Sequence, residues 1–184
     1  MNLIQIMLAE GNNVNERRFP TKILTELSVV VALSVILKDV LPPIYHLPQG
    51  GSITIVGLVP LLWFTLRRGF RFGVFAGALY GLVHMSLGGY VINPIQGLLD
   101  YPVAFAALGV AGLFKRYQLV GVGVGIVGRF ICSFLSGIFF FTSPTIEGAI
   151  ASAIYNGTYL IGEFVISAIV IYLFIRRGLL EIYL

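Results

Sequence analysis

Long apolar runs, separated by short breaks that carry charged or turn residues, constrain this chain more than any other feature of its sequence. A stretch of about 20 apolar residues is long enough to cross a bilayer as a helix. Backbone exposed to lipid must satisfy its own hydrogen bonds, so we expect these runs to be helical. Only 11% of the residues are charged and 58% are hydrophobic, whereas about a quarter of a soluble domain is charged. The sequence therefore predicts an all-α integral membrane protein with several spans.

The basic residues predict how such a bundle is oriented. We expect an N-terminal cytoplasmic tail over residues 1–20 and one transmembrane domain over 21–178, with six spans at about 23–41, 52–66, 70–87, 94–114, 119–141 and 148–175. Basic residues cluster before the first span, between the second and third, between the fourth and fifth, and after the sixth, whereas the other three breaks have none except Lys38 near the end of the first span. The positive-inside rule then places both the N- and C-termini in the cytoplasm.

Several kinds of chemistry have no support in the sequence. The single cysteine, Cys132, offers neither a disulfide nor a thiolate metal site. His46 and His84 are far apart, and no phosphate-binding loop or nucleophilic triad is present. We therefore expect no enzyme activity, no cofactor and no metal, and any energy for transport would come from a partner or an ion gradient.

One carboxylate stands out in the fourth run. Asp100 lies in an apolar stretch with no basic residue one turn away. A charged side chain at the centre of a membrane helix costs roughly 2.5–3.5 kcal/mol on insertion scales, so such residues usually line a cavity or pair with a partner. With a helical rise of about 1.5 Å per residue, Asp100 lies roughly 10 Å below the outer surface, and Asn156 and Ser133 lie roughly 12 Å below it.

Three runs thus place a polar residue at one level, and on each run further polar or aromatic residues lie on the same helical face. Asn93 and Gln96 precede Asp100 on one stripe, and two more stripes consist of Arg129, Ser133 and Ser136, and of Ser152, Tyr155, Asn156, Tyr159 and Glu163. Tyr90, Tyr101 and Phe141 surround them. We expect a wet pocket that opens to the outside and suits a flat organic cation. The carboxylate would supply the counter-charge, each tyrosine would add about 0.5–2 kcal/mol of cation–π attraction, and Asn156 could both donate to and accept from a heterocycle.

Other interpretations of these residues stay open. Buried Ser and Asn side chains often only join membrane helices, and we favour a structural ion pair for Arg129 and Glu163. We expect His84 to be a helix-packing residue and Gln49–Ser52 to be either a mobile lid or a turn. The small residues at Gly73, Gly77 and Gly81, and those at Ser28 and Ala32, repeat every four positions, which suits packing within the bundle or docking against another membrane protein.

An ordered set of short motifs gives a more specific indication. It comprises Leu66–Gly69, the segment Gln96–Phe114 with its Leu98-Leu99-Asp100-Tyr101-Pro102, the Ser136-Gly137 pair and Tyr155–Tyr159. With this set the chain resembles the thiamine-binding S components of energy-coupling factor transporters. The similarity extends over residues 21–177 and is densest over 66–116.

This resemblance implies a six-helix subunit of a prokaryotic plasma membrane that captures thiamine from outside. It would work with a transmembrane coupling subunit and two subunits that hydrolyse ATP, and would topple to release the vitamin inside. Asp100 matches the acidic position that binds the cation, and Asn156 matches the residue that reads the pyrimidine. Tyr90 and Tyr101 match aromatic ligand contacts, the loop with His46, Gln49, Gly50 and Gly51 matches the gate, and Ser28 and Ala32 match the docking pair. From the helical stripes and the position of a family tryptophan we add Gln96, Ser133, Tyr155 and Tyr80 as expected ligand contacts.

The chain also departs from that family. Gly51 and Ile55 stand where some members have Trp and Glu, and Ser133 stands where many have His. Tyr80 and Phe141 replace tryptophans. These changes remove stacking and hydrogen-bonding groups, so we expect weaker thiamine binding or a related ligand such as a phosphate ester or the pyrimidine half.

Two rival hypotheses belong to other functional classes. In the first, a solitary ion-coupled carrier uses Asp100, Arg129 and Glu163 to relay protons. In the second, the chain is a structural or assembly subunit without a ligand.

Overall fold

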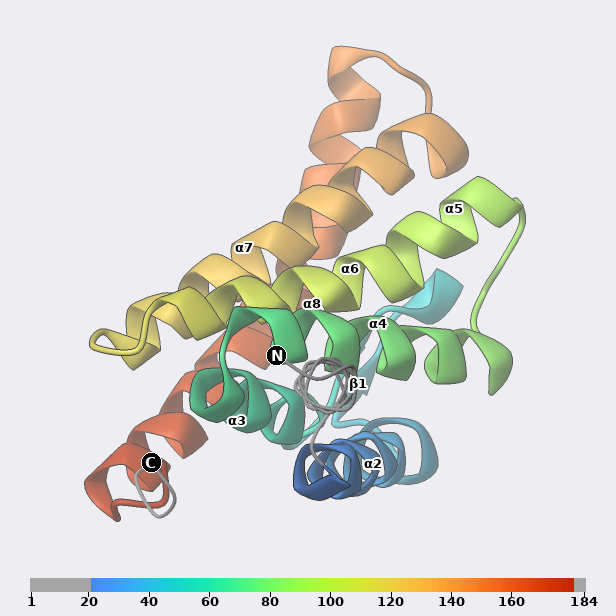
Figure 1. Cartoon of the computed structure of the whole chain (residues 1–184). Coiled ribbons are helices and arrows are strands. Elements are labelled where there is room, and N and C mark those ends of the chain that lie inside the picture. Colours follow the sequence, from blue (N-terminus) through green and yellow to red (C-terminus); the bar gives the residue numbers. More distant parts are fainter. Residues whose placement is uncertain (1–20, 181–184) are drawn as a thin grey trace, which may run out of the picture.

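The computed structural model describes residues 21–180, so the predicted cytoplasmic tail lies outside the described residues. Helices make up most of the described chain, with one short β-hairpin between the first two (Figure 1). The bounds are α2 Thr21–Val35, η1 Ile36–Val40, β1 Tyr45–His46, η2 Pro48–Gly50, β2 Ser52–Ile53, α3 Val59–Arg68, α4 Phe70–Ser86, α5 Pro94–Leu98, η3 Leu99–Val103, α6 Ala104–Ala107, η4 Leu108–Leu113, α7 Gln118–Ser136, η5 Gly137–Phe141 and α8 Ile146–Arg176.

The ends of these helices follow from local sequence. Asn93 caps α5, because its side chain accepts a hydrogen bond from Ile95 N at 2.9 Å, and Pro94 occupies the first helical position. Thr145 caps α8 in the same way by accepting from Gly148 N at 3.2 Å. Between α3 and α4 the chain turns at Gly69 with φ of 91°, a conformation that favours glycine.

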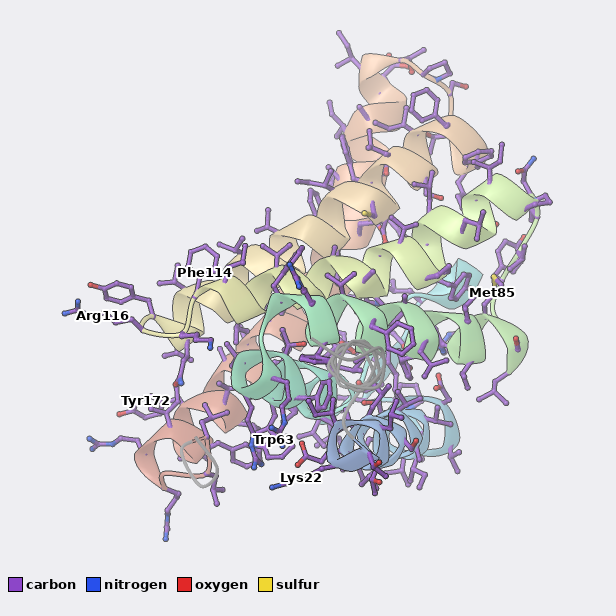
Figure 2. All side chains as sticks on the ribbon, viewed as in Figure 1. Lys22, Trp63, Met85, Phe114, Arg116 and Tyr172 are labelled. Atoms are coloured by element: carbon purple, nitrogen blue, oxygen red, sulfur yellow. The ribbon has the colours of Figure 1, made fainter. Side chains whose placement is uncertain are left out.

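Three helices of the described chain are long and apolar enough to cross a membrane. They are the rod formed by α5, η3, α6 and η4 (Pro94–Leu113), the rod formed by α7 and η5 (Gln118–Phe141), and α8. Figure 2 places Arg116, in the basic break before α7, and Met85, near the end of α4, at opposite ends of the molecule. The number of spans and the orientation of the termini stay predictions.

The second apolar run differs from its predicted helix. Helix α3 begins at Val59 rather than at Ser52, and its 10 residues are too few to cross a bilayer alone. The reason is a pairing between two strands, which the hydrophobic pattern of one segment does not predict. Residues Ser52–Ile53 form β2, which pairs antiparallel with β1, and Ile44 N donates to Ile53 O at 2.8 Å. The hairpin takes the place of the first helical turns.

The glycines of α4 pack within the bundle. A Cβ added at Gly77 would lie 2.1 Å from Phe105 O, and one at Gly81 would lie 2.6 Å from Tyr101 O. Helix α4 therefore touches the Pro94–Leu113 rod backbone to backbone, which decides between the two interpretations of this stripe. Ser28 and Ala32 instead lie exposed on α2.

Candidate functional site

A cavity of about 310 Å³ lies between the hairpin, α4, the Pro94–Leu113 rod, α7, η5 and α8. This volume is at the lower end of the range for small-molecule sites. Its lining comes from all of these elements and consists of Lys38, Gly50, Gly51, Ser52, His84, Tyr90, Gln96, Asp100, Tyr101, Phe105, Arg129, Ser133, Gly137, Phe141, Thr142, Ala151, Ser152, Tyr155, Asn156 and Tyr159. The helical stripes predicted from the sequence thus do meet at one cavity.

Asp100 lies at one end of this cavity on the π-helical turn η3. We name this end the outer end, after the predicted orientation, and the opposite end the inner end. Its Oδ2 accepts from Gln96 Nε2 at 2.6 Å and from Ser136 Oγ at 2.7 Å. Within residues 21–180 no ion pair joins this carboxylate. Both donors are neutral, so the negative charge of an ionised Asp100 is hydrogen-bonded but not neutralised.

Gln96 holds this end of the cavity together. Besides Asp100, its Nε2 donates to Tyr90 O at 3.1 Å, and its Oε1 accepts from Ile92 N at 3.0 Å. One turn of helix separates Gln96 from Asp100, so both side chains lie on one face. The segment before α5 is therefore fixed to the same side chain that orients the carboxylate.

Aromatic rings form much of the wall. Tyr90 and Phe141 lie with ring centroids 6.0 Å apart, and Tyr155 and Tyr159 lie 6.0 Å apart at 71°. Tyr101 also lines the cavity. Ring faces beside an uncompensated carboxylate are the surroundings that attract a desolvated organic cation.

The amide of Asn156 is already engaged within the protein. Its Nδ2 donates to Ser133 O at 3.2 Å and to Ser152 O at 3.0 Å, and its Oδ1 accepts from Tyr159 OH at 3.0 Å. Asn156 thus joins α8 to α7 and lines the cavity as well. A ligand that used this amide would replace one of these bonds.

The hairpin rests against α8 beside the cavity. Gly51 N donates to Tyr155 OH at 3.0 Å, and Tyr155 OH donates to Pro48 O. A Cβ at Gly51 would lie 2.8 Å from the Tyr155 hydroxyl oxygen, so the approach is close. Gly50 and Gly51 line the cavity, Gln49 lies in η2, and His46 is exposed on β1 away from the lining.

Tyr80 is not among the residues that line this cavity, so the geometry does not support its prediction as a ligand contact. The side chain is fully buried, its hydroxyl donates to Asp39 Oδ2 at 3.1 Å, and its ring packs edge-on against Phe105 with centroids 4.7 Å apart. Tyr80 thus contacts Asp39 of η1 and Phe105 of α6, so this tyrosine supports the residues behind the cavity.

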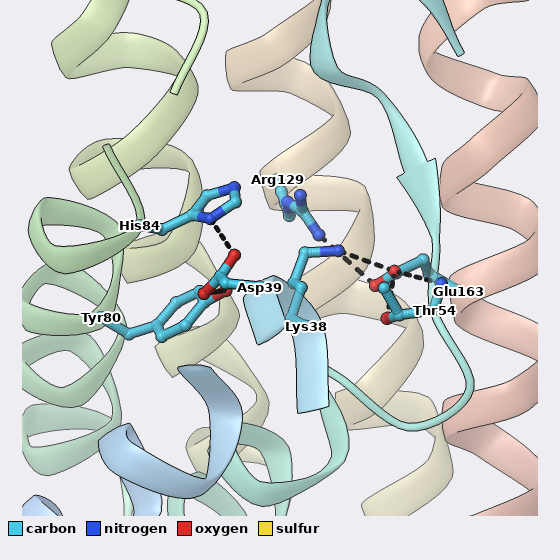
Figure 3. Close-up of polar contacts among 7 residues, drawn as sticks. All are labelled: Lys38, Asp39, Thr54, Tyr80, His84, Arg129 and Glu163. Carbon is cyan, nitrogen blue, oxygen red and sulfur yellow. Dashed lines mark hydrogen bonds and ion pairs between the residues drawn. The ribbon is translucent and has the colours of Figure 1, made fainter. Parts of the chain in front are cut away.

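The inner end of the cavity holds a cluster of charges that the sequence prediction missed in part (Figure 3). Lys38 Nζ lies 2.8 Å from Glu163 Oε1, which also accepts from Thr54 N at 3.2 Å and Thr54 Oγ1 at 2.9 Å. The predicted pair of Arg129 and Glu163 is confirmed at 3.7 Å, but Lys38 is the closer partner.

Asp39 adds a second acid to this inner end. His84 Nδ1 contacts Asp39 Oδ1, and the imidazole of His84 lines the cavity rather than only packing between helices. The available signal was a Lys-Asp pair at the end of an apolar run, where charges need partners.

A model of the thiamine transporter protein family matches residues 24–180. The chain belongs to this family. It is 35% identical over 168 residues to the thiamine transporter ThiT of Bacillus subtilis, covering 80% of this chain and 87% of the relative. It is 25% identical over 170 residues to the ThiT of Lacticaseibacillus paracasei, covering 78% and 85%. The solved structure of ThiT from Listeria monocytogenes has the same fold, with a TM-score of 0.76 and 24% identity over 86% of this chain and 95% of that one.

Family membership settles the general class. The relatives are transporters rather than enzymes, and the apolar helices agree with a membrane protein. Transport and thiamine binding are the properties that the family description carries.

Proposed function

We propose that this chain is a substrate-binding subunit that captures thiamine, or a close analogue, from outside a prokaryotic plasma membrane. The observation that carries this proposal is Asp100, a carboxylate without an ion-pair partner in residues 21–180, at the rim of a cavity walled by aromatic rings. Thiamine carries a flat, positively charged heteroaromatic ring, whose charge and shape complement this wall.

The proposed contacts follow from the position of each group. Asp100 faces the charged ring, and Tyr90, Tyr101 and Tyr155 supply ring faces around it. Gln96 and Ser133 support the carboxylate and the cavity wall. Gly50 and Gly51 belong to the hairpin that closes the cavity, while His46 and Gln49 lie in the same hairpin and contribute to its movement as a gate.

Energy for uptake would come from other subunits in this proposal. The sequence has no phosphate-binding loop, and the small, exposed face around Ser28 and Ala32 on α2 suits close approach of another membrane helix. We propose six spans with cytoplasmic termini and assembly with a coupling subunit and two ATP-hydrolysing subunits, as in energy-coupling factor transporters.

Calorimetry with thiamine on the detergent-purified chain tests the first part of the proposal. We expect saturable binding without ATP, and weaker binding by the Asp100→Asn variant. Failure of every thiamine compound to bind would support a structural subunit instead.

Uptake measurements test the second part. We expect cells to accumulate thiamine only when coupling and ATPase subunits are expressed with this chain, and Ala32→Trp to abolish uptake without changing binding. Gly157→Trp is the matched control, because a Cβ at Gly157 meets open space.

One observation favours a solitary carrier as the second candidate. Two groups of titratable side chains, Lys38 with Glu163 and Asp39 with His84, adjoin the cavity and resemble the buried pairs of proton-coupled transporters. Thiamine uptake into liposomes that contain this chain alone, driven by a pH gradient, would support the carrier and contradict assembly with an ATPase module.

A further inference from the structure

The inner end of the cavity contains an arginine whose hydrogen-bonding capacity is not used. Arg129 is only 5% exposed, yet its Nε and Nη1 find no hydrogen-bond partner within the described part of the chain. Buried guanidinium donors are costly to leave unpaired. The side chain lines the cavity, so a bound molecule can supply the missing acceptor.

Glu163 does not account for Arg129. The carboxylate is already paired with Lys38 at 2.8 Å and accepts two hydrogen bonds from Thr54. Arg129 Nη1 lies 3.7 Å from Glu163 Oε2, which is an ion pair but too long for a hydrogen bond. Lys38 and Thr54 thus satisfy Oε1 of Glu163, and the Nε and Nη1 donors of Arg129 stay free to bind another acceptor.

His84 presents a complementary group close to Arg129. Phe105 contacts both residues, with its ring centroid 4.2 Å from Arg129 Cζ and 5.5 Å from the His84 ring centroid. Asp39 engages Nδ1 of His84, so in the neutral ring Nδ1 carries the proton and Nε2 is an acceptor. Figure 3 shows the Arg129 side chain between His84 and the Lys38–Glu163 pair.

This end is shaped for a flat group and carries no excess of charge. The rings of Tyr101, Phe105 and Tyr159 surround it, and Arg129 Cζ lies 5.9 Å from the centroid of Tyr159. Lys38 and Arg129 carry two positive charges, and Asp39 and Glu163 carry two negative charges. A neutral heteroaromatic ring fits such a site better than a second charged group.

We propose that Arg129 and the Asp39-oriented His84, in place of Asn156, recognise the edge of the neutral aminopyrimidine half of the ligand, because the amide of Asn156 is already engaged within the protein. Arg129 donates to a ring nitrogen, and His84 Nε2 accepts from the exocyclic amine. Asp100 holds the charged ring at the other end. Its partner Ser136 lies seven residues along α7 from Arg129, which is about 10 Å at 1.5 Å per residue and suits a two-ring molecule. The inference rests on the proposed function and adds two selectivity residues to it.

Oxythiamine is the probe that tests this edge. It carries a carbonyl oxygen in place of the amine and a proton on the neighbouring ring nitrogen, so its donor and acceptor are exchanged. Calorimetry on the full-length wild type is expected to give an affinity for oxythiamine at least about tenfold below that for thiamine, because both inner groups then face like groups.

Three variants attribute this selectivity to its residues. In Arg129→Met and His84→Phe the preference for thiamine over oxythiamine is expected to fall to about threefold or less. Each variant removes one of the two groups that bind the pyrimidine edge, the Arg129 donor or the His84 acceptor. Arg129→Lys keeps the charge beside Glu163 but removes the forked donors, so its selectivity should fall as well. The exposed Arg116→Met is the matched control and should retain the wild-type ratio.

The outcomes separate this inference from the proposed function. Tight thiamine binding with an unchanged ratio in Arg129→Lys and His84→Phe would overturn the inference and leave the proposed function intact, as would equal binding of both compounds by the wild type. Absence of thiamine binding by the wild type would overturn both. A loss of affinity for both compounds by the same factor would assign Arg129 a structural role only and contradict the inference.

Discussion

At the outer end of the cavity a single carboxylate, Asp100, is held by two neutral donors, whereas at the inner end Lys38, Arg129, Glu163 and Asp39 balance one another. Both ends bury ionisable groups in a low-dielectric region, where an uncompensated charge is costly. The outer end leaves that charge available to a cation. The inner end uses its charges to join η1, α7, α8 and Thr54 beside the hairpin, so the two ends should respond differently to mutation.

Removing the charge of Glu163 tests whether the inner end stabilises the fold, and we expect it to have the largest effect of the four variants. Glu163→Gln leaves Lys38 and Arg129 buried without their shared partner, which should destabilise the fold by about 3–5 kcal/mol. The measurement is thermal or denaturant unfolding in detergent. Glu147→Gln, at an exposed position near the start of α8, is the control. An unchanged unfolding transition in Glu163→Gln would show that the inner cluster is not structural.

Removing the outer acid tests the binding side. Asp100→Asn should cost about 1.5–3 kcal/mol of thiamine binding, the range for a hydrogen bond to a charged group. The unfolding temperature should stay the same or rise, because within residues 21–180 no ion pair involves this carboxylate and the variant therefore breaks none. Calorimetry gives the affinity. Equal affinities for wild type and variant would remove Asp100 from the site and end the contrast between the two ends.

The hydrogen bonds between Tyr155 and the hairpin provide a smaller test at the outer end. Tyr155→Phe deletes the hydroxyl that bonds Gly51 N and Pro48 O, so closure should weaken by about 1 kcal/mol. We expect the dissociation rate of thiamine to rise about fivefold while association changes little. Stopped-flow fluorescence measures both rates, with Tyr172→Phe on the exposed surface of α8 as control. A slower association with unchanged dissociation would place the barrier elsewhere.

The smallest expected effect concerns Tyr80, behind the inner end. Tyr80→Phe loses the hydrogen bond to Asp39 and should reduce stability by about 1 kcal/mol. Thiamine affinity should not change, because the side chain does not line the cavity. A large loss of thiamine affinity at unchanged stability would show that Tyr80 does contact the ligand.

Much of the outer end could be predicted from sequence because it depends on helices alone. A rise of 1.5 Å per residue and a period of 3.6 residues place Asp100, Ser133 and Asn156 at one depth, with Gln96 one turn before Asp100 on the same stripe, and these residues do line one cavity. The same reasoning gave the long helices, whose observed bounds lie within a few residues of the predicted spans.

The inner end could not be predicted in the same way because the hairpin creates it. Residues 44–53 fold back on themselves, which brings Thr54 to Glu163 and buries Lys38 at 6% exposure. In a simple helix bundle Lys38 and Asp39 would instead lie at the surface beside Pro42. The pairing of β1 with β2 joins two strands across a turn, and hydrophobic periodicity along the sequence does not predict such a pairing. For the same reason the helical prediction for 52–58 was wrong.

The contact between α4 and the Pro94–Leu113 rod has a practical consequence. With Gly77 and Gly81 pressed against carbonyls of the neighbouring backbone, this side of the molecule has no room to shift, while the hairpin is fastened by a few bonds. A fluorescent label on the hairpin should therefore respond when the vitamin enters, and a label on the exposed face of α4 should stay silent. The chain offers a ready arrangement for a ratiometric thiamine sensor, with its reference dye and its reporter dye on the same polypeptide.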